Sequence, residues 1–279
     1  MDETTPAFRT RTGLTIPALP AEVLREVRSA LQGNYGLHTA QLAEAASYSF
    51  AMVVRYALGL SAEGGQVCAV VRDDLSGSIA LATLRHIINA GGSGFAIITT
   101  PPEGDLSIDL QLQLAPLEAL GVPFESIAGI DPAQFGDLIS QCHNVLWGGS
   151  SLVQSGFQLA PEYIVALNEA RTPVHAIELP AGIDPDSGAP EATALYASST
   201  LALGAPLTGL WHGREYAGRI YVCDQSIPPL LYRQAAPDGE TPWEKLFAEQ
   251  PVVQVFPITG EEDQSPPAGG AEGGGSTTP

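Results

Sequence analysis

A carboxylate that follows a short apolar run is the residue of this chain best suited to chemistry. The run begins at Val174 and carries Glu178 up to Pro180 and Gly182. Proline ends strand pairing because it lacks an N–H, and glycine lets the backbone approach a ligand closely. Ligands of open α/β sheets bind just outside the carboxyl ends of the strands. Glu178 is therefore a candidate acid, base or metal ligand, and a solvated turn acid is the competing interpretation.

A turn rich in glycine and serine is the second candidate for ligand binding. Gly148, Gly149, Ser150 and Ser151 follow an apolar run that begins at Asn144. Backbone N–H groups of such a turn can bind a phosphate, although a plain tight turn would have the same sequence. The chain has a single lysine, so other phosphate contacts would have to come from arginine or from helix N-termini.

The remaining polar candidates have simpler interpretations. Asp184 and Asp186 are expected to cap backbone N–H groups of their own loop rather than to act in catalysis. Asp73 and Asp74 follow another apolar run, where the sequence is compatible with a cation site and with a solvated turn. His175 borders a strand and is expected to be a structural histidine.

The elements that must position these residues alternate between strand and helix. Strand-like apolar runs lie at 67–71, 95–100, 144–147, 174–179, 200–203 and 219–223. Helical spacing of apolar residues occurs twice within 20–60 and again at 79–89, 110–120, 135–142 and 161–171. This alternation predicts an α/β fold with a mostly parallel sheet covered by helices on both faces.

Composition shifts divide the chain into four segments. Residues 1–19 are predicted to form a flexible N-terminal arm, 20–234 the α/β domain and 235–260 a C-terminal extension. Within the extension, residues 243–247 suggest a short docking helix and 252–256 a final strand. Residues 261–279 contain glycine, proline, serine, threonine and acids without a large apolar residue, so this acidic tail is expected to be disordered.

Charge and cysteine usage restrict the partners. The 279-residue chain has 31 acids and 12 bases, a net charge of −19, which disfavours nucleic acid and anionic membrane surfaces as partners. It contains no apolar run long enough to span a membrane and no secretory signal at its start. Cys68, Cys142 and Cys223 are widely spaced and odd in number, which argues against a disulfide framework and a zinc site and favours the cytoplasm.

Four segments also match a known family in their order and spacing. The family motif Asp-Ile-Pro-Ser-Gly-Leu-Asp corresponds to Glu-Leu-Pro-Ala-Gly-Ile-Asp at 178–184, and Ala-Asp-x-Thr-x-Thr-x-Gly-x-Pro-Lys to 197–207. The late Ala-Gly-x-Val-x-Val strand with its closing Gly-Ile-Pro is similar to 217–222 and 226–228, and the early Leu-Met-Glu-Asn-Ala-Gly to 42–47. Over about residues 24–229 the chain thus resembles the NAD(P)H-hydrate epimerase family, also called the YjeF N-terminal domain.

The resemblance implies a fold, an activity and a set of site residues. The fold is a Rossmann-like, three-layer αβα sandwich. The activity is epimerisation of the hydrated forms of NADH and NADPH, called NAD(P)HX, in which a motif carboxylate transfers a proton and a potassium ion lies near the nucleotide phosphate. The motif and the glycine-rich turn together assign cofactor binding to Gly148, Gly149, Ser150, Ser151, Ala181, Gly182, Asp184 and Leu207.

The departures from the family pattern fall on its polar positions. The catalytic Asp of the family corresponds to Glu178, which adds a methylene, and a displacement of about 1 Å is already costly in catalysis. The motif serine corresponds to Ala181 and the family lysine to Leu207. A potassium-binding Asp corresponds to Asn144, whose amide carbonyl can bind a cation without contributing a charge.

Three functions are compatible with this pattern. The first is a divergent epimerase-like protein that keeps a nucleotide-sized cleft for NAD(P)HX or a related nucleotide and has weak or lost activity. The second is an active epimerase in which Glu178 is the acid/base. The third is a non-catalytic scaffold or interaction module, a homodimer for example, in which the apolar faces of residues 21–31 and 42–54 contact a partner.

The substitution at Leu207 leads to an expectation about affinity. Leucine cannot contact a phosphate, and loss of one charge-assisted contact weakens binding about ten- to a hundredfold. We therefore expect weak dinucleotide binding, which Leu207→Lys would strengthen about tenfold if this side chain faces the ligand.

Overall fold

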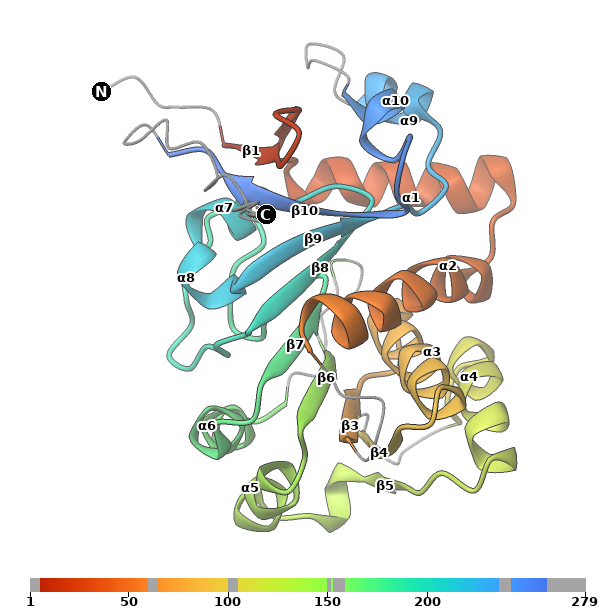
Figure 1. Cartoon of the computed structure of the whole chain (residues 1–279), viewed down its shortest axis with the longest axis vertical. Helices are drawn as coiled ribbons and strands as arrows, with labels where there is room; N and C mark the ends of the chain where they lie inside the picture. Colours follow the sequence, from red (N-terminus) through yellow and green to blue (C-terminus); the bar gives the residue numbers. More distant parts are fainter. Residues whose placement is uncertain are drawn as a thin grey trace, which may run out of the picture.

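A mostly parallel sheet with helices on both faces carries the candidate residues, as the sequence predicts (Figure 1). The computed structural model describes residues 6–59, 65–99, 105–149, 152, 159–235 and 242–259. Within these, ten strands form one sheet in the order β2-β1-β10-β9-β8-β7-β6-β3-β4-β5. The strands from β9 to β5 in this order are parallel to one another. At the other end of the sheet, β10 is antiparallel to β9, β1 to β10, and β2 to β1.

The bounds of the elements follow the chain. The strands are β1 (Ala7–Thr10), β2 (Thr15–Pro17), β3 (Gln66–Val71), β4 (Ser93–Ile98), β5 (Phe124–Ser126), β6 (Asn144–Gly148), β7 (Val174–Ile177), β8 (Ser199–Leu203), β9 (Arg219–Cys223) and β10 (Val252–Pro257). The helices are α1 (Ala21–Tyr35), α2 (Thr39–Met52), α3 (Leu75–Asn89), α4 (Ile108–Ala119), α5 (Pro132–Ser140), α6 (Pro161–Ala170), α7 (Thr208–His212), α8 (Arg214–Ala217), α9 (Pro229–Ala235) and α10 (Trp243–Leu246). A π-helix, η1 (Val53–Ala57), extends α2, and a 3-10 turn, η2 (Ile127–Gly129), follows β5.

Alternate residues of each parallel strand enter opposite layers of the core. In β3, Val67, Ala69 and Val71 pack with α2, α3 and α4, whereas Cys68 and Val70 pack on the other face with α5 and α6. A strand with a side-chain period of two can be apolar throughout only if both of its faces are covered. The continuous apolar runs of the sequence are thus strands in the centre of a three-layer sandwich.

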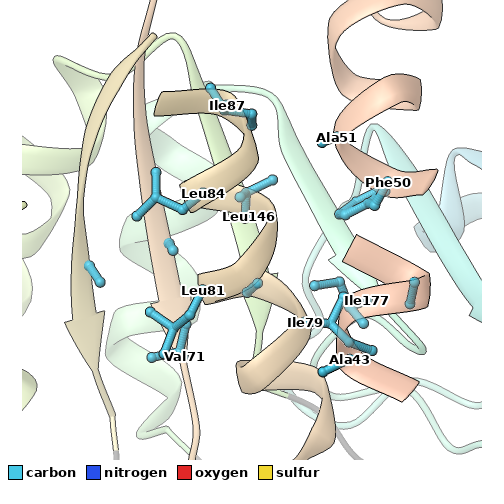
Figure 2. Packing of buried hydrophobic residues seen from close by; sticks show 14 of the residues in the cluster. Ala43, Phe50, Ala51, Val71, Ile79, Leu81, Leu84, Ile87, Leu146 and Ile177 are labelled. Atoms are coloured by element: carbon cyan, nitrogen blue, oxygen red, sulfur yellow. The ribbon is translucent and has the colours of Figure 1, made fainter. Parts of the chain in front are cut away.

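The layer beneath α2 and α3 is densely apolar. Figure 2 shows side chains of α3, among them Leu81 and Leu84, beside Val71 of the sheet, with Phe50 of α2 nearby. On the opposite face α1 packs against β8, β9 and β10 through a second cluster that contains Leu24 and Leu31.

This packing bears on the proposed interaction module. The apolar faces of 21–31 and 42–54 are buried against the chain's own sheet, so neither is available to a partner in this conformation. No described helix is both long enough and apolar enough to span a membrane.

The two ends of the chain extend the sheet. The segment predicted as a flexible arm contributes β1 and β2, because Phe8 and Ile16 are fully buried. In the extension, α10 and β10 form where a short helix and a final strand were predicted. The acidic tail, 261–279, lies outside the described residues.

Candidate active site

Glu178 lies directly beyond the carboxyl end of β7, at the position predicted from the sequence. Its φ is 71°, a left-handed conformation that is uncommon for a residue with a Cβ. Its backbone N–H donates to the carbonyl of Leu201 at 2.8 Å, and the residue is 2% exposed. The chain turns sharply here, and the carboxylate is directed into the protein rather than into solvent. Glu178 is therefore not a solvated turn acid.

Both carboxylate oxygens of Glu178 have partners within the protein. Oε1 forms an ion pair with the guanidinium of Arg28, on the buried face of α1. Oε2 accepts a hydrogen bond from the backbone N–H of Leu152 at 3.1 Å. Arg28 also donates to the carbonyl of Leu203 at 3.4 Å, so the guanidinium links α1 to the ends of two strands. The pair is buried, since the two side chains are 7% and 3% exposed.

Arg28 is the site residue that the motifs did not reveal. A signal was present, because Arg28 lies four residues after Leu24 and three before Leu31, on the apolar face of the predicted helix. A charge at such a position requires a buried partner. The sequence alone did not indicate which of the 31 acids that partner would be.

Asp74 is a second buried carboxylate at this edge of the sheet. It caps α3, since Oδ1 accepts hydrogen bonds from the Ser76 hydroxyl at 2.7 Å and the Gly77 N–H at 2.9 Å. Oδ2 is buried without a hydrogen-bond partner among the described residues and lies 3.7 Å from Nε of Arg72. Burial raises the pKa of the Asp74 carboxyl, and the nearby Glu178 charge raises it further, against the lowering effect of the cap bonds and of Arg72. The structure thus supports neither a solvated turn nor an exposed cation site at Asp74.

The cap at Asp74 gives a first testable prediction. Asp74→Ala should lower the free energy of unfolding by about 1 kcal/mol, because the Gly77 N–H loses its acceptor. Asp74→Asn keeps an acceptor and removes a buried charge, so its stability should remain within about 0.5 kcal/mol of the parent. Urea unfolding of the two variants at neutral pH would check this, and equal losses in both would show that the cap bond is not what Asp74 contributes.

The glycine-rich turn has a packing role. A Cβ on Gly148 would lie 2.6 Å from the carbonyl oxygen of Ser76 and 2.9 Å from Cα of Gly77, so β6 needs glycine to accommodate the start of α3. A Cβ on Gly149 would meet the ring of Trp147 at 2.4 Å. Ser150 and Ser151 lie outside the described residues. The phosphate-binding role of this turn remains a prediction.

The loop after Glu178 is organised by its own polar groups, as predicted. Asp184 accepts hydrogen bonds from the N–H groups of Asp186 at 3.1 Å and Ser187 at 2.7 Å, and from the Ser187 hydroxyl at 2.8 Å. The bonds from Ser187 lower the pKa of the Asp184 carboxyl. Asp186 accepts from the Ala21 N–H at 2.7 Å and so caps α1, the helix that carries the arginine partner of Glu178.

One glycine and one alanine, Gly182 and Ala181, complete this loop. Gly182 has φ 71°, and a Cβ there would lie 2.3 Å from the carbonyl oxygen of Thr193, so glycine is required on both grounds. Ala181 is half-buried and packs on the cluster beneath α6. Both residues lie in the loop that leaves Glu178, as the motif predicts.

Asn144 does not join this constellation. It begins β6, and because β6 and β7 are parallel it lies at the amino edge of the sheet, whereas Glu178 lies beyond the carboxyl edge. Its Oδ1 accepts a hydrogen bond from Nε2 of His175 at 2.7 Å, and Nδ1 of His175 lies 2.9 Å from the Ser199 hydroxyl. The residues present therefore do not fit a potassium site formed by Asn144 beside the glycine-rich turn. In the described part of the chain, no three His, Cys, Asp or Glu side chains cluster as metal ligands.

Leu207 also differs from the expectation. It is 1% exposed and packs in the apolar cluster with Leu19 and Leu210. A lysine here would place its ammonium group among apolar side chains, which is unfavourable without a partner. The structure thus gives no support to a gain in phosphate affinity on Leu207→Lys.

Comparison with known proteins identifies relatives in sequence. The family model described as YjeF-related protein N-terminus matches residues 39–209. An NAD(P)H-hydrate epimerase of Dehalogenimonas lykanthroporepellens is 27% identical over 229 residues, which cover 82% of this chain and 89% of the relative. A bifunctional NAD(P)H-hydrate repair enzyme of Salinibacter ruber is 23% identical over 79% of this chain and 42% of its own length.

Among solved structures, the yeast protein YNL200c shares the fold. It superposes with a TM-score of 0.70 at 18% identity, over 86% of this chain and all of that chain. This agreement supports the Rossmann-like sandwich at the level of element order and packing.

Proposed function

The chain belongs to the family of YjeF-related protein N-termini, and from this membership we propose that it is a divergent NAD(P)H-hydrate epimerase-like protein with weak or lost epimerase activity. One observation carries the proposal. The carboxylate at the family's catalytic position, Glu178, is held by Arg28 and by the Leu152 N–H.

Proton transfer requires a carboxylate oxygen within hydrogen-bond reach of the substrate. Both oxygens of Glu178 already have partners, and a substrate proton taken up by either of them would neutralise the charge that compensates Arg28. Displacing Arg28 would leave a buried charge without compensation, which is strongly unfavourable. Glu178 is therefore positioned as one half of a structural ion pair that joins α1 to the sheet.

The polar groups that would orient a nucleotide are also reduced. Ala181 lacks the hydroxyl of the family motif, and Leu207 replaces a lysine within an apolar cluster. Each missing charge-assisted bond weakens binding by about tenfold or more. We propose that any nucleotide of the NAD(P)HX class binds weakly at the carboxyl edge of the sheet.

The central test is the rate of epimerisation. Purified protein mixed with one NADHX epimer should produce the other at close to the uncatalysed rate, followed by chromatography, and Glu178→Gln should not change that rate. The Dehalogenimonas relative assayed alongside would show that the assay detects catalysis. Enzymatic turnover that disappears in Glu178→Gln, with circular dichroism showing that the variant remains folded, would refute the loss of activity.

A second candidate function is an active epimerase, and the neighbouring carboxylates favour it. Two carboxylates in different environments are a common acid/base arrangement, and burial raises the pKa of Asp74 while Arg28 compensates Glu178. In that case the assay would show turnover that falls in Asp74→Asn as well as in Glu178→Gln. Turnover that survives both substitutions would exclude this pair as the acid and base.

A further inference from the structure

A large cavity lies on the molecule away from Glu178. It has a volume of about 1130 Å³ and is formed by the turn between β1 and β2, the end of α2 with η1, the start of β9, and the segment from α10 into β10. Figure 1 shows that β10 runs from the region of α10 to a place beside β1. The lining of the cavity extends from Arg219 at the start of β9 to Val252, opposite Cys223 at the end of that strand, and its described residues include none of Glu178, Arg28 and Leu152. The cavity is therefore separate from the candidate active site.

Three cationic side chains line this cavity: Arg11, Arg219 and Lys245. They are a quarter of the 12 bases in a chain with 31 acids, and Lys245 is its sole lysine. Among the described residues of the lining the sole acid is Glu249, so this described lining is positive in a molecule of net charge −19.

No described carboxylate neutralises these three cations. Among the described residues, none of them forms an ion pair with a carboxylate. Arg11 donates to the amide oxygen of Gln254 at 3.1 Å, and Arg219 donates to the carbonyl of Ala57 at 3.4 Å. Both acceptors are uncharged, so the positive charge remains available to an anion.

The other walls are largely apolar. Val53 and Leu246 are buried at the cavity, and Met52 and Val252 are partly buried or exposed beside them. Tyr56, at 68% exposure, presents an aromatic ring at the same place. Small-molecule sites typically combine such apolar walls with a few polar groups that fix the orientation of the ligand.

We propose that this cavity binds an amphipathic organic anion, a molecule with an apolar body and a carboxylate or phosphate group. The apolar walls accommodate the body, and the cationic side chains of the lining, Arg11, Arg219 and Lys245, supply the positive charge that attracts the anionic group. The proposal does not depend on epimerase activity, because the described lining includes neither Glu178 nor its partners Arg28 and Leu152.

Calorimetric titration with decanoate and with decyl phosphate, both below their micellar concentrations, tests the proposal. At least one of the two should bind, and the one that binds more tightly assigns the anionic group. Decanol, which has the same body without charge, should bind at least about tenfold more weakly, since it loses the charge-assisted contacts.

Matched variants locate the site. The double variant Arg219→Gln, Lys245→Gln should weaken binding of the preferred anion by at least about tenfold, and Ala57→Trp, which fills the cavity, should also weaken it. Arg171→Gln removes one exposed charge elsewhere and should leave the dissociation constant unchanged. Absence of binding by both anions, equal binding of decanol, or an unchanged constant in the double variant would each overturn the proposal.

Discussion

Replacing Arg28 by methionine is expected to lower the free energy of unfolding by about 3–5 kcal/mol, the effect of removing one partner from a buried ion pair. Methionine fills part of the volume of arginine, so the loss arises mainly from the charge of Glu178. That carboxylate would keep only the Leu152 N–H as a partner in a site that is almost closed to water. Urea unfolding at neutral pH measures the difference.

Two further variants separate charge from packing. The double variant Arg28→Met, Glu178→Leu should recover most of the stability, because apolar replacement of a whole buried pair is often neutral or stabilising. Arg233→Met breaks an exposed pair with Glu244 and should lose less than about 1 kcal/mol. If Arg28→Met lowers the free energy of unfolding by no more than this control does, the buried pair does not hold α1 to the sheet.

The same pair shows what the sequence could and could not predict at the site. The position of Glu178 at a strand end followed from the apolar run and the proline after it. Its partner lies 150 residues earlier, and nothing local to either residue specifies the contact. Periodicity places Arg28 on a buried face, but the choice of partner depends on how α1 crosses the strand ends, which is a tertiary property.

The fold was more accessible than the site, for a physical reason. Strands covered on both faces must be apolar throughout, so the central strands were visible as continuous runs. The short edge strand β5 was missed because all three of its residues are exposed, and an exposed strand has no apolar pattern. The pair β1 and β2 was missed because each buries only one large apolar residue, Phe8 and Ile16.

Asn144 illustrates a limit of motif transfer. The resemblance associated it with a cation, and the sequence showed only that it borders a strand. The strand runs from Asn144 toward Gly148, so Asn144 lies at the end opposite to the site, and His175 binds its side-chain oxygen. The direction of the strand, from Asn144 to Gly148, can be read from the sequence, and it would have placed Asn144 at the edge of the sheet opposite to the site.

His175 leads to another prediction, a loss of stability as the pH falls from about 6.5 toward 4. Burial lowers the pKa of the imidazole from 6.5 to about 4. The unfolded chain therefore binds a proton in this range that the folded chain does not, and protonation favours unfolding. The contribution of His175 is complete above about pH 6.5 and should fall by about 2–3 kcal/mol by pH 4.5.

The measurement is the difference in unfolding free energy between the parent chain and His175→Gln across pH 4.5 to 8. Other groups titrate in both proteins, so their contributions cancel in the difference. The free energy of unfolding of the parent should decrease relative to that of the variant by about 2–3 kcal/mol as the pH falls. A difference independent of pH would mean that the folded protein admits a proton at His175. The bond from Nε2 of His175 to Asn144 would persist in that case, because a protonated ring also donates from Nε2.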